Sequence, residues 1–335
     1  MDVLFVPGGF RFSAHVDAGV QWGLEQNGHS LKRLCRDCLR IIGQGALEKV
    51  KADVLVTVHG RRFPHRLLRE VGYPTVVWLV DEPQEVDLSE GYGRHFDIVL
   101  TNDANTCGVH GPHKCWYLPL AADPRMHRPG LPDRELVDVT FVGGILPERG
   151  QLLDRVFALT PDVAWRIVGP DRWHKDVSFS GAWQRRSVDH AEYVALMRAA
   201  RIVLDIPRDE LVSFAGRTNR RAVPVMAVNT RVFEVTACGK FLLTSDARRD
   251  VFRLFPNGEV GIYRHGDAAD LARQIRYYLE HEDEREEMAE AARETCMREH
   301  TYPVRVKQLT DIVEQWKATQ MPPRQSKGKV ARKKK

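Results

Sequence analysis

Short apolar runs alternate with amphipathic segments along most of this chain, and this alternation limits the folds that are open to it. The first series of expected strands covers residues 3–6, 54–59, 75–80 and 98–101. Helical patterns lie between these runs, for example at residues 16–25 and 64–70. Apolar strands separated by helices indicate a parallel sheet that is covered on both faces. We therefore predict an α/β fold.

A second series of the same kind begins near Val137. Its expected strands cover residues 139–142, 165–168, 202–206, 241–244 and 260–263, with helices that include residues 151–159 and 191–200. A segment with three prolines, residues 121–133, separates the two series, as a linker would. The pattern predicts two doubly wound, Rossmann-like domains with a cleft between them. The predicted parts are domains 1–127 and 128–300, a helix at 301–318 that packs back toward the first domain, and a tail at 319–335.

The composition is that of an ordinary globular protein. Of the 335 residues, 43% are hydrophobic and 28% are charged, which excludes a disordered chain. We find no uncharged apolar run of about 18 residues that would predict a membrane span. The first residues read as a strand rather than as a signal peptide. Six cysteines in a chain of this length do not make a disulfide framework, so we expect reduced thiols and a cytoplasmic protein.

The basic character of the chain belongs to its end. The formal net charge is +5, and the last 16 residues contain seven basic side chains and no acidic one, so the remainder carries 5 − 7 = −2. We expect this tail to be disordered, since it lacks an apolar face. Two interpretations stay open: a solvated end, or an electrostatic tether to nucleic acid or another polyanion through Lys327, Lys329, Arg332, Lys333, Lys334 and Lys335.

Two motifs in the second series could hold a nucleotide. The run 138–153 reads as a strand, then Gly143 and Gly144, then a helix that carries Arg149. Glycines let a ligand approach the backbone, and a helix N-terminus can receive a phosphate. Further on, Arg231 and Glu234 are three residues apart, so they share one face of a helix. Such a carboxylate can accept hydrogen bonds from ribose hydroxyls and such an arginine can pair with phosphate, although a capped helix with a surface ion pair would show the same spacing.

Polar side chains end two of the expected strands in the first series. Asp81 follows the run 75–80, at the edge where α/β sheets place their ligands, and could serve as a base or bind a hydroxyl group. His59 ends another strand, where it could polarise a reacting group. His15, after the Pro7–Gly9 turn, is a weaker candidate. For each of these residues, the alternative is a polar strand end or a turn.

Cysteine and histidine gather in the segment 107–115, which contains Cys107, His110, His113 and Cys115. The spacing is tighter than common zinc folds use, so we interpret the segment as a loop between strands and predict no metal site. Cys35 and Cys38 have the spacing of a metal or redox pair, but no second pair follows them.

Taken together, the motifs resemble those of a known family. Residues 116–124, 138–144 with Glu148 and Arg149, 231–239, and 275–302 occur in the order found in two-domain GT-B glycosyltransferases, specifically the CgeB-like (spore maturation protein B-like) group. The resemblance runs from about Trp116 to Trp316. It implies an enzyme that moves a sugar from a nucleoside diphosphate donor, expected to be a UDP-sugar, to an unidentified hydroxyl acceptor.

The resemblance also assigns roles to the domains and to single residues. The first domain would hold the acceptor and the second the nucleotide sugar. Glu234 would bind the ribose, while Arg149, Arg231 and the Gly143–Gly144 turn would face the pyrophosphate, with no metal ion or cofactor. Related retaining enzymes carry a second glutamate eight positions earlier, where this chain has Met226. This departure leaves the stereochemical outcome open.

Two other functions remain open at this stage. One is a glycosyltransferase that modifies hydroxymethylated bases in DNA and uses the basic tail as a tether. The other is a binding or coat-assembly protein that keeps the fold without catalysis.

Overall fold

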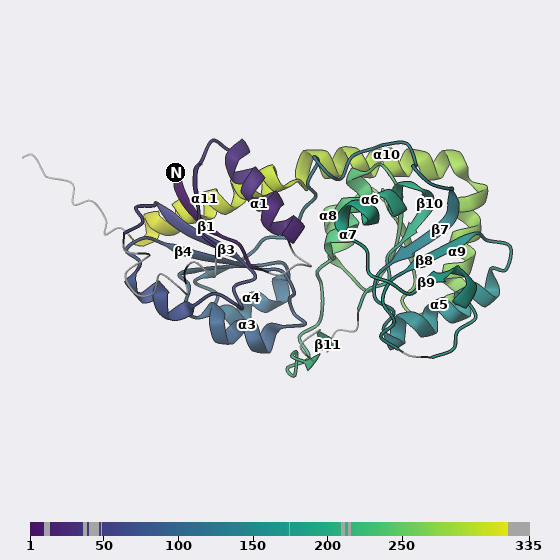
Figure 1. Cartoon of the computed structure of the whole chain (residues 1–335), viewed down its shortest axis with the longest axis horizontal. Helices are drawn as coiled ribbons and strands as arrows, with labels where there is room; N and C mark the ends of the chain where they lie inside the picture. Colours follow the sequence, from purple (N-terminus) through teal and green to yellow (C-terminus); the bar gives the residue numbers. More distant parts are fainter. Residues whose placement is uncertain are drawn as a thin grey trace, which may run out of the picture.

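The computed structural model describes residues 1–9, 14–35, 39, 47, 49–173, 175–208, 212–213 and 216–320. It consists of two α/β domains that lie side by side (Figure 1). The basic tail lies outside the described residues, so its predicted disorder and polyanion binding stay predictions.

The first domain contains a parallel six-stranded sheet in the order β2-β1-β3-β4-β5-β6. The strands are β1 (Asp2–Val6), β2 (Ser30–Arg33), β3 (Val54–Val58), β4 (Thr75–Leu79), β5 (Ile98–Thr101) and β6 (Cys115–Tyr117). β3 and β4 are buried along their whole length, which explains their continuous apolar sequences. The strand predicted at 54–59 ends one residue earlier, because His59 has a positive φ of 65° and leaves the extended conformation.

The second domain repeats this architecture with the order β14-β13-β10-β7-β8-β9, again parallel. The strands are β7 (Val137–Val142), β8 (Trp165–Val168), β9 (Trp183–Gln184), β10 (Ala200–Leu204), β13 (Phe241–Ser245) and β14 (Gly261–Tyr263). A short antiparallel hairpin joins β11 (Val212–Ser213) to β12 (Gly216–Arg217). The prediction of two Rossmann-like domains is confirmed.

Helices cover both sheets (Figure 1). The α-helices are α1 (Ala14–Gln26), α3 (Val86–Gly93), α4 (Cys107–His110), α5 (Pro147–Leu159), α6 (His190–Arg198), α7 (Thr230–Ala237), α8 (Asp250–Leu254), α9 (Ala268–Glu280), α10 (Glu282–Glu299) and α11 (Tyr302–Gln320). Among the described residues, 3₁₀ helices form at η2 (His65–Glu70), η3 (Ala104–Thr106) and η4 (Ser180–Ala182). The helix predicted at 64–70 is therefore a 3₁₀ helix.

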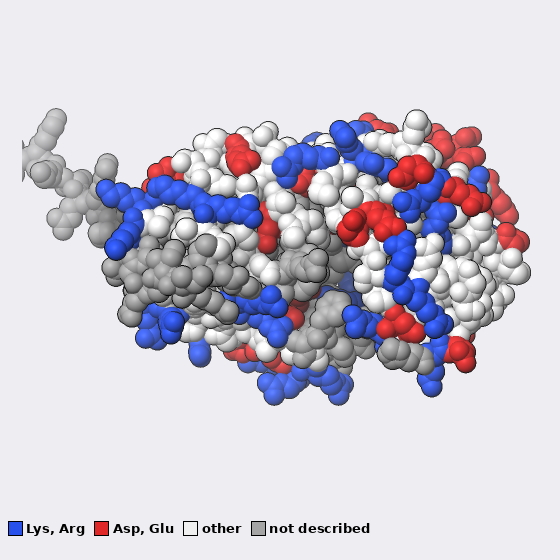
Figure 2. Space-filling view, in the orientation of Figure 1, with Lys and Arg blue, Asp and Glu red and all other residues white. Residues whose placement is uncertain are grey.

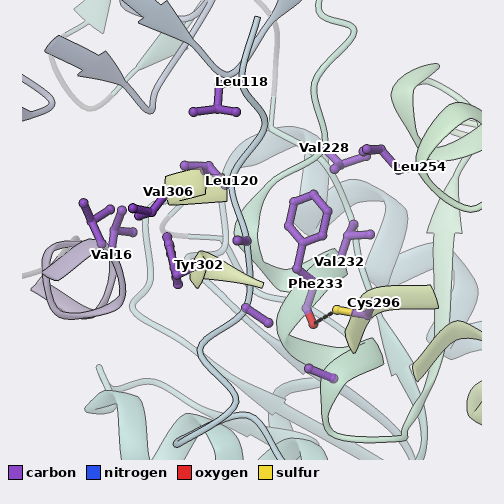
Figure 3. Close-up of a cluster of buried hydrophobic side chains, with 14 of the residues drawn as sticks. Val16, Leu118, Leu120, Val228, Val232, Phe233, Leu254, Cys296, Tyr302 and Val306 are labelled. Carbon is purple, nitrogen blue, oxygen red and sulfur yellow. Dashed lines mark hydrogen bonds between the residues drawn. The ribbon is translucent and has the colours of Figure 1, made fainter. Parts of the chain in front are cut away.

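The chain crosses between the domains at two places that lie next to each other. Ala122 lies on the first crossing and forms a parallel β-bridge with Thr301, which lies on the second crossing. α11 then packs on α1, where a side chain at Gly19 would collide with the ring of Tyr302. Residues of both domains share one hydrophobic cluster, to which α7 contributes Val232 and Phe233 and α11 contributes Tyr302 and Val306 (Figure 3). This shared core holds α7 at the boundary between the domains.

The surface and the thiols bear on earlier expectations. Acidic side chains gather over the end of the molecule where α9 meets α10 (Figure 2), in line with the negative charge expected for the chain without its tail. None of the described helices is long and apolar enough to cross a membrane.

Cys107, Cys115, Cys238 and Cys296 are free, but Cys35 is disulfide-bonded, so the expectation of reduced thiols is wrong for that residue.

Candidate active site between the two domains

The glycine turn after β7 packs closely against the neighbouring strand end at Gly169. The Gly143 amide donates to the Val168 carbonyl at 2.8 Å, and a Cβ atom added at Gly143 would lie 3.1–3.5 Å from Phe141, Arg231 and Arg149. A Cβ at the neighbouring Gly169 would lie only 1.8 Å from the Gly143 carbonyl oxygen. Glycine is therefore required at Gly169, and the turn beside it leads to the N-terminus of α5.

Two arginines flank this turn. Arg149 donates from Nε to the Ile206 carbonyl at 2.9 Å and from an Nη atom to the Gly144 carbonyl at 3.2 Å. Arg231 donates to the Val142 carbonyl, and both guanidinium groups lie over the Phe141 ring at 5.6 and 5.5 Å from its centroid. Burial, with the nearby charge of Arg231, lowers the pKa of Arg149 to about 9. The structure thus brings Gly143, Gly144, Arg149 and Arg231 together, in agreement with their placement on the sequence.

Asp205 organises this cluster, and sequence analysis did not find it. It follows β10, is 1% exposed, and accepts hydrogen bonds from Arg231 at 2.6 Å, Asn229 at 2.9 Å and Thr244 at 2.9 Å. Asn229 in turn caps α7 by accepting from the Arg231 amide at 2.8 Å. Burial opposes ionisation of Asp205, yet Arg231 and these donors hold its pKa below the usual value. Asp205 therefore fixes the start of the helix that carries Glu234.

Glu234 is buried on α7 and faces histidines from several elements. Its Oε1 lies 3.3 Å from Nε2 of His15 and 3.9 Å from Nε2 of His127, and its side chain is 3% exposed. Oε1 lacks a hydrogen-bond partner among the described residues. Burial opposes ionisation, but the contact with His15 and the charges of His127 and His190 hold the pKa of Glu234 well below its usual range. Glu234 is thus an ionised, buried carboxylate whose Oε1 lies against the rings of His15 and His127.

The histidines around Glu234 form a connected group. His127 and His190 contact each other through their Nε2 atoms at 2.7 Å, and His127 Nδ1 accepts from the Asp123 amide. The rings of His15 and His190 are stacked, with centroids 4.3 Å apart and planes 9° from parallel. His15, His190 and Glu234 each place one potential metal ligand within 4.8 Å of the others. Ring nitrogens direct their lone pairs within the ring plane, so two nearly parallel rings do not converge well on one ion.

The first domain contributes a second polar cluster, at the carboxyl ends of β3 and β4. His59 Nε2 lies 3.4 Å from Asp81 Oδ2 and 3.7 Å from Glu85 Oε2, and these three residues form the other group that could hold a metal ion. Arg208, from the second domain, binds Asp81 Oδ1 at 2.9 Å. Burial opposes ionisation of Asp81, but His59 and Arg208 lower its pKa to about 2. The structure thus brings His59 and Asp81, which were considered separately from the sequence, into one cluster.

The cysteine-rich segment belongs to neither cluster. Cys107 hydrogen-bonds to Cys115, and His110 contacts Glu82 at 3.2 Å instead of turning toward the thiols. Within the described part of the chain, neither group with metal-binding potential contains a cysteine. The segment spans α4 and β6, as a connection between elements does.

Comparisons with known proteins agree with this geometry. Residues 149–311, which include Arg149, Asp205, Arg231 and Glu234, match the glycosyl transferase-like family. The chain is also 24% identical over 262 residues to the spore protein CgeB of Bacillus subtilis (strain 168), covering 73% of this chain and 78% of that protein. The sucrose-phosphate synthase of Thermosynechococcus elongatus has the same fold, with a TM-score of 0.64 and 11% identity over 95% of this chain and all of that one.

The chain has the GT-B fold. Another structure with this fold is that of Anabaena Alr3699/HepE in complex with UDP-glucose, with a TM-score of 0.62 and 15% identity over 94% of this chain and all of that one. AviGT4, a glycosyltransferase of avilamycin A biosynthesis, has a TM-score of 0.62 and 14% identity over 95% of this chain and 99% of its own.

Several residues of the candidate site come from positions that sequence analysis passed over. His127 lies in the linker, His190 is the first residue of α6, and Arg208 and Asp205 follow β10. Asp205 had one usable signal, an acidic residue directly after a buried strand, which is where parallel sheets place functional side chains. The histidines had no local signal, because only the tertiary fold brings them to Glu234.

Proposed function

We propose that the protein transfers a sugar from a UDP-sugar to a hydroxyl acceptor, and that Glu234 binds the ribose of the donor. The observation that carries this proposal is the buried, ionised carboxylate of Glu234, which lies one helical turn after Arg231 and has histidines as its neighbours at Oε1. A carboxylate of this kind accepts hydrogen bonds from vicinal hydroxyls strongly. The complex of Anabaena Alr3699/HepE with UDP-glucose supports a uridine nucleotide as the donor.

The chemistry of the leaving group explains the arginines at the turn. When the bond between the sugar and the diphosphate breaks, negative charge grows on the diphosphate. Arg149, Arg231 and the N-terminus of α5 concentrate positive charge near Gly143 and Gly144, and burial strengthens their effect. We propose that these groups stabilise the leaving diphosphate without a divalent ion. We further propose that the protein works in the cytoplasm.

The test is the substitution Glu234→Gln, which keeps the shape of the side chain and removes its charge. Losing a charged hydrogen-bond acceptor costs about 1.5–3 kcal/mol, so we expect affinity for UDP to fall about 10-fold to 150-fold in calorimetry. Glu192→Gln is the matched control, because Glu192 lies in the same domain and pairs with Arg186 on the surface. If Glu234→Gln binds UDP as tightly as the parent protein does, the ribose assignment is wrong.

A further inference from the structure

Glu85 combines burial with an unused oxygen atom, a combination that Asp81 beside it lacks. Its side chain is 5% exposed, Oε1 accepts from Arg61 at 3.3 Å, and Oε2 has no hydrogen-bond partner among the described residues. Oε2 lies 3.7 Å from Nε2 of His59, so it faces the polar cluster at the ends of β3 and β4. From this geometry we infer that Glu85 is a catalytic residue that takes the proton of the acceptor hydroxyl, an inference that rests on the proposed sugar transfer.

Asp81 and Glu85 differ in their contacts, and this difference indicates different roles for the two carboxylates. Asp81 has both oxygen atoms engaged, one with Arg208 and one with His59, and these partners make it a weak base. Burial and the charge of Asp81 instead raise the pKa of Glu85, although His59 and Arg61 oppose this. A raised pKa makes a carboxylate a better proton acceptor near neutral pH. Asp81 is then a positioning residue that fixes His59 and Arg208, while Glu85 remains able to accept a proton.

The position of Glu85 relative to the proposed donor site is set by the segment Asp205–Arg208. At one end, Asp205 binds Arg231 beside the glycine turn, and at the other end Arg208 binds Asp81 next to Glu85. Three peptide units span at most about 11 Å between the Cα atoms of Asp205 and Arg208, so one short segment after β10 links the two polar clusters across the domain boundary. The acceptor hydroxyl would enter from the side of Glu85, opposite the diphosphate.

The proposed sugar transfer needs no reagent other than the donor and the acceptor. The acceptor oxygen forms a bond to the anomeric carbon, and the bond from that carbon to the diphosphate oxygen breaks with its electron pair going to the diphosphate. The hydroxyl proton moves to Oε2 of Glu85. Because attack and departure occur on opposite faces, the configuration at the anomeric carbon is inverted.

The experiment compares a nucleophile that carries a proton with one that does not. UDP release from UDP-glucose is measured with water as the acceptor and with added sodium azide, for the parent protein, Glu85→Ala and the control Glu90→Gln. Glu90 lies on α3, whose N-cap is Glu85, is 43% exposed and pairs with Arg221. We expect Glu85→Ala to release UDP at least about 100-fold more slowly with water, and azide to restore most of the rate because it has no proton to lose. UDP affinity and thermal stability should match the parent, and the glucosyl azide should have the β configuration.

Other outcomes would overturn this inference, and they differ from failure of the proposed function. Water-dependent release by Glu85→Ala at the parent rate shows that Glu85 is not the base. Slow release that azide does not restore, with UDP affinity intact, shows a structural or positioning role. A third outcome is that EDTA abolishes the activity of the parent protein and that Mn²⁺ restores it in the parent but not in Glu85→Ala. This result would show that Glu85 is a metal ligand. If the parent releases no nucleotide from UDP-, ADP- or GDP-glucose, the proposed function fails, and the inference fails with it.

Discussion

Replacing Asp205 with alanine is expected to lower the free energy of unfolding by about 3–5 kcal/mol, because it leaves a buried arginine without its counter-charge. Asp205 accepts from Arg231, Asn229 and Thr244, and its backbone carbonyl accepts from the Tyr263 hydroxyl at 3.1 Å. Removal of the carboxylate also frees the Asn229 cap of α7, so Glu234 should lose its fixed position. Urea denaturation followed by tryptophan fluorescence measures the loss, and UDP calorimetry should show weaker binding.

A second variant separates the effect of the buried charge from the loss of packing. The double substitution Asp205→Ala with Arg231→Met removes both charges, and we expect it to recover part of the lost stability. Glu192→Ala is the control for a solvent-exposed ion pair and should leave the urea midpoint close to that of the parent protein. If Asp205→Ala unfolds at the same urea concentration as this control, the Asp205–Arg231 pair does not carry the stability that its burial implies.

The strands that are buried on both faces of a sheet could be predicted from the sequence alone. β3 and β4 contain only apolar residues apart from two threonines, and a run of this kind has few alternatives to a parallel sheet. The strands that were missed lie at or near the sheet edges. β2 reads Ser-Leu-Lys-Arg and is largely exposed, and β9 has only two residues. Their pairing depends on the neighbouring strand rather than on a pattern of their own.

The site was predictable only where its residues are close in the chain. Arg231 and Glu234 share one helix, and Gly143, Gly144 and Arg149 share one turn, so local spacing indicated them. Glu234 lies against His15, which is 219 positions away (234 − 15), and Arg208 binds Asp81, which is 127 positions away. No periodicity in the sequence encodes such contacts. They depend on the packing of α7 between the two domains and on the path of the chain after β10.

Arg305 lies where the two crossings between the domains meet, and its geometry predicts an effect on both stability and catalysis. It is 3% exposed, and its Nε donates to the carbonyl groups of Pro119 at 3.0 Å and Leu120 at 3.3 Å on the first crossing. One Nη atom donates to the Glu299 carbonyl at 2.9 Å on the second crossing, and the other contacts Nδ1 of His300 at 2.7 Å. Burial lowers the pKa of Arg305 to about 10, so the group stays charged at neutral pH.

We expect Arg305→Ala to lower the free energy of unfolding by about 3 kcal/mol, because it removes several charged hydrogen bonds and leaves buried carbonyl oxygens without donors. The variant should bind UDP almost as the parent does, since Arg149, Arg231 and Glu234 lie in the second domain. Sugar transfer should fall further, because it also needs the first domain in place. Arg298→Ala, at a side chain that is 60% exposed, is the control and should cost less than about 1 kcal/mol. A loss of UDP affinity as large as the loss of transfer would show that Arg305 supports the second domain alone and does not set the relation between the two.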